Sequence, residues 1–243
     1  MRLYSNFANF FVHTCENKTY MVTCAIGIID ITFLHSPGVH CAIGGGSSDF
    51  IITSTLSSQA PTAVGRALAI GMPACTLPSD SISFVTVGDG SVNNAHFLSA
   101  TNMSEYSEFR RVRCPVLFGI SDNRLCISLR GYGWLNRFLE KLRMRVFKCN
   151  GNNVFDVYRS TAEAAAYCRE SGKPATVVYQ DIQRRFGHAA TDRQHAYMSG
   201  KEIDRLVRHN PVEGICAQVG AVVATQYRKL QIKIGELFPI RFY

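Results

Sequence analysis

The stretch "SISFVTVGDGSVNNAHF", residues 81–97, decides the fold, because an apolar run is followed at once by Gly-Asp-Gly. The apolar run predicts a buried β-strand over residues 82–87. Asp89 then stands between Gly88 and Gly90, where that strand ends. Burying a carboxylate is costly unless a cation meets it. The stretch therefore predicts a strand whose end carries binding chemistry.

Other apolar runs bounded by turn residues predict further strands. They cover residues 115–120, 144–149 and 174–180, with one more within 21–34. Continuous apolar runs of this kind are typical of parallel strands buried on both faces. With the helices expected between them, they predict an α/β fold whose mostly parallel sheet has helices on both faces.

Three segments carry helix signals. Residues 57–72 predict a helix with Pro61 in its first turn. Ser160, with Glu163 three residues on, predicts the start of a second helix that ends at Gly172. Ser199 and Glu202 repeat the same capping box, and the Asn210-Pro211 pair predicts the end of that helix.

A second polar loop is expected beside Asp89. The strand over 115–120 is followed by "SDNRLCIS", which carries Asn123. If the two strands are neighbours, both loops lie at the carboxyl edge of the sheet, where open α/β folds bind ligands. A carboxylate, an amide oxygen and a backbone carbonyl suit Mg²⁺, with phosphate oxygens completing its shell. The two glycines allow backbone to approach a phosphate closely.

Composition excludes some function classes and leaves others open. The formal net charge is +8 over 243 residues, but the basic residues are spread out, without an aromatic-interleaved stripe. That excess fits an anionic ligand or an acidic partner protein, and we expect no nucleic acid. The apolar segment 21–34 is too short to span a membrane and contains Asp30. Nine cysteines without a Cys-x-x-Cys pair predict reduced thiols in an intracellular protein.

Four blocks of the sequence, in order, resemble the α-type half of 2-oxoacid dehydrogenase E1 components, and the last two are most similar to the branched-chain type. They are "TSTLSSQAPTAVGRALA" (53–69), "GDGSVNNAHF" with "CPVLFGISDNRLCIS" (88–128), "GNNVFDVYRSTAEAAAYCRESGKPATV" (151–177) and "RRFGHAATDRQHAYMSGKEI" (184–203). The resemblance implies a thiamine diphosphate-binding fold over residues 37–210. Residues 1–36 are a divergent segment and 211–243 a helical tail.

The resemblance also implies roles for individual residues. Asp89, Asn123 and the Leu125 carbonyl bind Mg²⁺, and His188 is the active-site histidine. The cofactor is thiamine diphosphate, contacted by Ser54, Leu56, Gly88, Asp89, Gly90, Ser91 and Asn123. In some relatives a potassium ion lies at the positions of Thr55, Ser58 and Gln59.

The sequence departs from the family in several places. The interval from Gly-Asp-Gly to Asn123 is longer than usual, and we expect "SEYSEFRRVR" (104–113) to absorb the excess at a helix end. Ser121 replaces an arginine that often contacts the diphosphate. Ala189 replaces the serine that animal relatives phosphorylate. The Tyr-Arg pair that grips the diphosphate from an upstream segment has no match.

The implied reaction is the oxidative decarboxylation of a small 2-oxo acid. The glutamate that activates the cofactor comes, in the family, from a β-type E1 subunit or domain, so we expect such a partner here. This chain would then be half of an active site, or a fragment of an α/β-fused chain. An E2 acyltransferase lipoyl domain is the second partner. The resemblance implies the mitochondrial matrix for a eukaryotic protein and the cytoplasm for a bacterial one. The alternative is a non-catalytic protein of the same fold that acts as a binding or structural partner.

Each site residue also has an ordinary structural interpretation. Asp89 could cap a helix, Asn123 could be a turn residue, and His188 could be a solvated loop histidine. His40, His96 and His195 are more often structural or exposed than near a cofactor. We interpret the Arg184-Arg185 pair as surface charge. "GGGSS" (44–48) lacks the Lys-Ser/Thr ending of a phosphate loop and is expected to be a connection.

Overall fold

The computed structural model describes residues 10–15, 18–23, 55–126, 129–130, 133–184, 187 and 192–209, with five further single residues (214, 225, 228, 229 and 232). Its centre is a parallel sheet of four strands in the order β3-β4-β8-β7. These strands are β3 (Ser83–Gly88), β4 (Val116–Ser121), β7 (Arg145–Asn150) and β8 (Ala175–Gln180). Each begins and ends within one residue of its predicted range, which confirms the four strand predictions.

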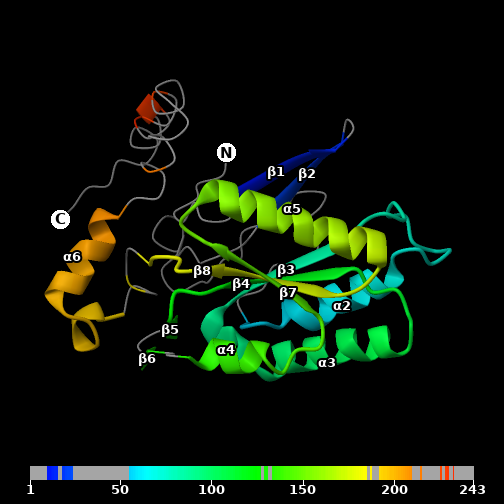
Figure 1. Ribbon diagram of the computed structural model, residues 1–243, viewed down its shortest axis with the longest axis horizontal. Helices are drawn as coiled ribbons and strands as arrows, with labels where there is room; N and C mark the ends of the chain where they lie inside the picture. The colour runs from blue at the N-terminus through cyan, green and yellow to red at the C-terminus, as the bar shows by residue number, and fades with distance from the viewer. Residues whose placement is uncertain are drawn as a thin grey trace, which may run out of the picture.

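Helices cover both faces of this sheet (Figure 1). α2 (Gln59–Ala69), α3 (Ala95–Phe109) and α4 (Trp134–Leu139) lie against one face, and α5 (Val154–Ser171) crosses the other. The predicted fold class, an α/β fold with a mostly parallel sheet between helices, is therefore confirmed.

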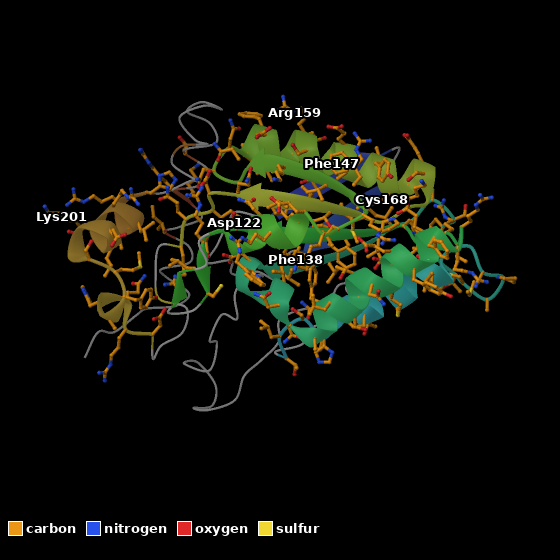
Figure 2. All side chains as sticks on the ribbon, turned by 60° about the horizontal axis from the view of Figure 1, so that its bottom comes forward. Asp122, Phe138, Phe147, Arg159, Cys168 and Lys201 are labelled. Atoms are coloured by element: carbon orange, nitrogen blue, oxygen red, sulfur yellow. The ribbon has the colours of Figure 1, made fainter. Side chains whose placement is uncertain are left out.

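Alternation along the strands assigns side chains to the two faces. In β4, Phe118 and Ile120 pack toward α2, α3 and α4, whereas Leu117 packs toward α5. Phe138 of α4 and Phe147 of β7 lie on opposite sides of the sheet (Figure 2). β4 is buried along its whole length, as expected for an apolar strand in the interior of a parallel sheet.

Two strands near the N-terminus form a separate antiparallel pair. β1 (Phe10–Cys15) pairs antiparallel with β2 (Lys18–Thr23). The strand predicted within 21–34 overlaps the end of β2, and the rest of that window lies outside the described residues. The GGGSS segment also lies outside them.

Two of the three helix predictions are confirmed in detail. α2 contains Pro61 in its first turn. α6 (Gly200–Arg208) begins with the predicted capping box, in which the Ser199 side chain accepts from the Glu202 N–H and the Glu202 carboxylate accepts from the Ser199 N–H. It ends before Asn210, as the Asn-Pro pair predicts.

The predicted start of α5 at Ser160 is wrong. The helix begins six residues earlier, because Asn153 caps it by accepting from the N–H groups of Phe155 and Asp156. Val157 is buried against the sheet, so the first turns are held by packing as well as by the cap. Ser160 is buried within the helix. The end at Gly172 is confirmed, and its φ of 68° is the left-handed conformation that glycine adopts readily.

The remaining elements lie where the parallel strands end. η2 (Asp89–Asn93) follows β3, the short pair β5 (Leu125–Cys126) and β6 (Leu129–Arg130) follows β4, and η3 (Gln194–Ala196) precedes α6. These carboxyl ends point toward α6 and β5, on the left of Figure 1. The residues "SEYSEF" complete α3, so the extra length before Asn123 does extend a helix end, as expected.

None of the described helices combines the length and apolarity that crossing a membrane requires. Five described cysteines are free thiols, and Cys114, Cys149 and Cys168 are buried. Most of the predicted tail over 211–243 lies outside the described residues.

Candidate functional site

Asp89 lies at the carboxyl end of β3, as the first residue of η2. The residue is only 7% exposed. Burial, and then the negative charge of Asp122, raise the pKa of the Asp89 carboxyl from 3.8 to about 6, although backbone N–H groups of Gly90 and Arg124 oppose the shift. Asp89 does not cap α3, because Asn94 takes that place by accepting from the His96 N–H. Burial makes the ionised form of this carboxyl costly, and a bound cation would offset that cost.

The Asn123 loop lies beside it. β4 is the hydrogen-bonded neighbour of β3, so the loops after both strands meet at one edge. Asn123 Oδ1 accepts from the Leu125 N–H at 2.9 Å, which makes Asn123 a turn residue as well as a candidate ligand. An amide oxygen has two lone pairs, so one remains for a metal ion.

Packing holds the two loops against each other. β5 packs on η2, and a Cβ at Gly90 would lie 2.7 Å from the Cys126 sulfur. Position 90 is therefore suited to glycine, because a larger residue there would collide with Cys126. The structure thus brings Asp89, Gly90, Asn123 and Leu125 together, as the sequence predicted, and their roles as ligands stay predictions.

The segment before α2 contacts the same loop. Ser57 is 2% exposed, and its hydroxyl donates to the Ser91 carbonyl at 3.4 Å. Gln59 Nε2 donates to the Thr86 carbonyl near the end of β3, at 3.1 Å. Leu56, expected to contact the cofactor, is largely exposed. Ser54 lies outside the described residues.

Backbone strain gathers at this edge. Four described non-glycine residues have positive φ, and three of them, Ser57, Arg124 and Asp181, have φ of 60° and lie in loops at the carboxyl ends of the strands. The fourth, Arg111, follows the end of α3. Non-glycine residues in this conformation cost free energy and concentrate at functional sites.

The donor set fits magnesium and a diphosphate. One buried carboxylate, one amide oxygen and one backbone carbonyl are hard ligands of the kind Mg²⁺ takes, with phosphate oxygens and water completing the shell. The described residues contain no group of three or more His, Cys, Asp or Glu that could hold a metal, and the expected set includes only one such side chain. The hydroxyl of Ser121, at the end of β4, is buried without a hydrogen-bond partner.

The positions expected for potassium offer weaker support. The Ser58 hydroxyl donates to the Thr55 carbonyl at 3.0 Å. Gln59 Oε1 is buried and has no hydrogen-bond partner. This amide oxygen could accept a cation, so the potassium site stays a prediction.

His188 lies outside the described residues, but the residues on either side of its segment are held together. Arg184 and Asp192 form an ion pair of 3.4 Å whose side chains are 10% and 4% exposed. The Tyr197 hydroxyl donates to Asp192 at 2.8 Å and accepts from Arg184. Burial, and then the hydrogen bond with Asp192, raise the pKa of the Tyr197 hydroxyl. The interpretation of Arg184 as surface charge is therefore wrong, because a buried acid pairs with it.

The structure gives the other candidate histidines no contact with the site among the hydrogen bonds of the described residues. His96 and His195 are exposed, and His40 lies outside the described residues. Sequence reasoning missed Arg124, Asp122 and Asp181. Asp122 and Arg124 stand in the Asn123 motif itself, and that proximity could have drawn attention to them. No local signal predicted the left-handed conformation of Asp181 or Ser57.

Comparison with known proteins identifies the family. The family model for the dehydrogenase E1 component matches residues 45–221, more than half of the chain. The chain therefore belongs to the dehydrogenase E1 component family.

Curated relatives include α subunits of 2-oxoacid dehydrogenases. The 2-oxoisovalerate dehydrogenase subunit alpha of Bacillus subtilis is 26% identical over 175 residues, covering 66% of this chain and 47% of that protein. The 3-methyl-2-oxobutanoate dehydrogenase subunit alpha of Mycobacterium tuberculosis is 26% identical over 173 residues, covering 65% and 41%. This chain thus spans about half the length of the curated relatives it matches, or less.

Among solved structures, a transketolase variant of Pichia stipitis in complex with xylulose 5-phosphate matches with a TM-score of 0.42 and 17% identity. The match covers 54% of this chain and 20% of the transketolase. A similarity this low adds no argument to the family assignment.

Proposed function

We propose that this chain binds the diphosphate and magnesium ion of thiamine diphosphate as the α-type part of a dehydrogenase E1 component that decarboxylates a 2-oxo acid. One observation carries the proposal. The buried carboxyl of Asp89 and the oxygens of the Asn123–Leu125 turn meet at the carboxyl ends of neighbouring parallel strands, in a chain of this family.

The residues have distinct tasks in this proposal. Asp89 supplies the negative ligand of Mg²⁺, and Asn123 and the Leu125 carbonyl supply neutral ones. Gly90 lets the η2 backbone approach β5 closely. When bound, thiamine diphosphate accepts the electron pair that remains when CO₂ leaves a 2-oxo acid. His188 holds or moves a proton near the substrate, since its side chain can titrate near neutral pH.

The proposed partners follow from the family. A β-type E1 subunit or domain completes the site by contributing the glutamate that activates the cofactor. An E2 lipoyl domain receives the product of the reaction. The two curated relatives named for branched-chain 2-oxo acids favour a substrate of that class.

Reconstitution tests this proposal. The purified chain is assayed for 2-oxo acid decarboxylation with an artificial electron acceptor, alone and with a β-type subunit. We expect no turnover by the chain alone and turnover with the partner. Turnover by the homogeneous chain alone would refute the shared site. If thiamine diphosphate binds but no β-type subunit restores turnover, the chain is the non-catalytic partner protein instead.

The same reconstituted enzyme tests His188. His188→Ala should lower the single-turnover rate by roughly 10²–10⁴-fold at saturating cofactor, as loss of an acid–base group typically does. His195→Ala is the matched control, because His195 is exposed in η3, and its rate should equal that of the wild type. A wild-type rate for His188→Ala would remove it from the mechanism.

A further inference from the structure

The segments that directly follow the four parallel strands carry few positive charges. In residues 88–94, 121–126, 150–153 and 180–184, the cationic side chains are Arg124 and Arg184. Arg184 is buried in its ion pair with Asp192. Asp89, Asp122 and Asp181 stand in the same loops. Within these described segments Arg124 is therefore the exposed cation, among three carboxylates, and Arg193, farther along the loop after β8, is exposed as well.

Arg124 is placed between two proposed magnesium ligands in the chain. It separates Asn123 from Leu125, and its backbone N–H is close enough to lower the pKa of Asp89. Its φ of 60° is one that an arginine adopts only at a cost. The surrounding structure therefore holds this backbone in place.

The guanidinium of Arg124 has an exchangeable partner. Its Nη2 lies 2.5 Å from Asp181 Oδ1, and the two side chains are 61% and 55% exposed. An exposed ion pair of this kind contributes little free energy, because water and salt screen it. Arg124 can leave Asp181 at small cost if a stronger anion arrives.

We propose that Arg124 binds the diphosphate, exchanging its Asp181 partner for phosphate oxygens when the cofactor enters. This inference rests on the proposed function. The diphosphate and the Asp89 carboxylate together carry more negative charge than Mg²⁺ can balance, so a further cation at this edge is favourable. Arginine suits the task because its planar fork can bind phosphate with two parallel hydrogen bonds. Asp181 acts as a competing anion that holds Arg124 before the cofactor binds.

Calorimetry with two probes, thiamine diphosphate and inorganic pyrophosphate, each with Mg²⁺, tests the exchange. Arg124→Gln should weaken the binding of both probes by about 10- to 100-fold, the loss of a charged hydrogen bond to phosphate. Asp181→Asn should tighten both, by up to about 5-fold, because it removes the competitor. Arg111→Gln is the matched control, since it removes one exposed arginine with a similar φ, 58°, near the other end of the sheet.

The double variant separates exchange from a general effect of charge. In the Arg124→Gln background, Asp181→Asn should no longer tighten binding. Equal tightening with and without Arg124 would overturn the exchange, and so would wild-type affinity in Arg124→Gln. If the wild type binds thiamine diphosphate equally well without Mg²⁺, or if Asp89→Ala binds it as tightly as the wild type does, the proposed function is refuted. If it binds neither probe, both proposals fail.

Discussion

The two ends of the parallel sheet differ in how their polar groups are satisfied. At the amino ends, the Cys114 N–H donates to the Gly172 carbonyl at 2.8 Å, and Arg113 donates to the carbonyls of Ser79 and Arg169. The Glu105 carboxylate accepts from the Arg143 N–H at 2.6 Å, just before β7. These hydrogen bonds connect the loops at the amino ends with one another and with α3 and α5.

At the carboxyl ends backbone groups are likewise paired, for example the Asp122 N–H with the Tyr179 carbonyl, but several buried side-chain groups are not. Asp89 is buried with a raised pKa, and the oxygens Gln59 Oε1, Ser121 Oγ and Gln183 Oε1 are buried without hydrogen-bond partners. Left-handed backbone occurs there at three non-glycine residues. One end of the sheet is built for stability, and the other keeps unsatisfied groups and strain, as ligand-binding sites do.

The largest stability effect that we expect comes from neutralising Asp89. Its pKa in the folded protein is about 6, above the ordinary 3.8, so the folded state binds this proton more tightly than the unfolded chain does. The stability from protonation is complete below pH about 4 and is lost as pH rises through about 6. Asp89→Asn should therefore stabilise the metal-free protein at pH 7.5, by roughly 2–3 kcal/mol.

Chemical denaturation in the presence of a chelator, from pH 4 to 8, measures this effect. Asp89→Asn should flatten the fall in stability between pH 4 and 6 that the wild type shows. If Asp89→Asn has the wild-type free energy of unfolding at pH 7.5, the ionised carboxylate does not destabilise the metal-free protein.

A smaller effect is expected from relieving strain at Arg124. Arg124→Gly and Arg124→Gln both remove the ion pair with Asp181, but only glycine adopts a φ of 60° without cost. The glycine variant should be the more stable of the two by about 0.5–1 kcal/mol, after its greater unfolded-state entropy is subtracted. Thermal denaturation compares them, with Arg111→Gly and Arg111→Gln as a pair near the amino end. Equal stabilities of the Arg124 variants would mean that this backbone is unstrained.

The smallest change should come from the amino ends. Glu105→Ala removes the acceptor of the Arg143 N–H. Because that N–H can then bond to water, the fold should be destabilised by only about 0.5 kcal/mol. Magnesium-dependent binding of thiamine diphosphate should stay at the wild-type level. A parallel loss of binding would mean that the two ends are not separable.

The sequence predicted the parallel sheet well because its strands are short segments rich in apolar residues, with clear turn residues at both ends. It also predicted that the loops of Asp89 and Asn123 meet, since neighbouring parallel strands end at one edge. It misplaced the start of α5, because the cap at Asn153 and the packing of Val157 outweighed the Ser160 pattern. It missed the pairing of Arg184 with Asp192, because the contact forms across a loop and no local periodicity encodes it.

The central claim is that Asp89 anchors a magnesium ion that holds a diphosphate. The most direct measurement is calorimetry of thiamine diphosphate binding, with and without Mg²⁺, to the wild type, Asp89→Ala and Asn123→Ala. We predict that binding to the wild type requires Mg²⁺ and that Asp89→Ala abolishes this magnesium-dependent binding. Asn123→Ala should lose less affinity, because it removes a neutral ligand. Unchanged, magnesium-dependent affinity in Asp89→Ala would contradict the account.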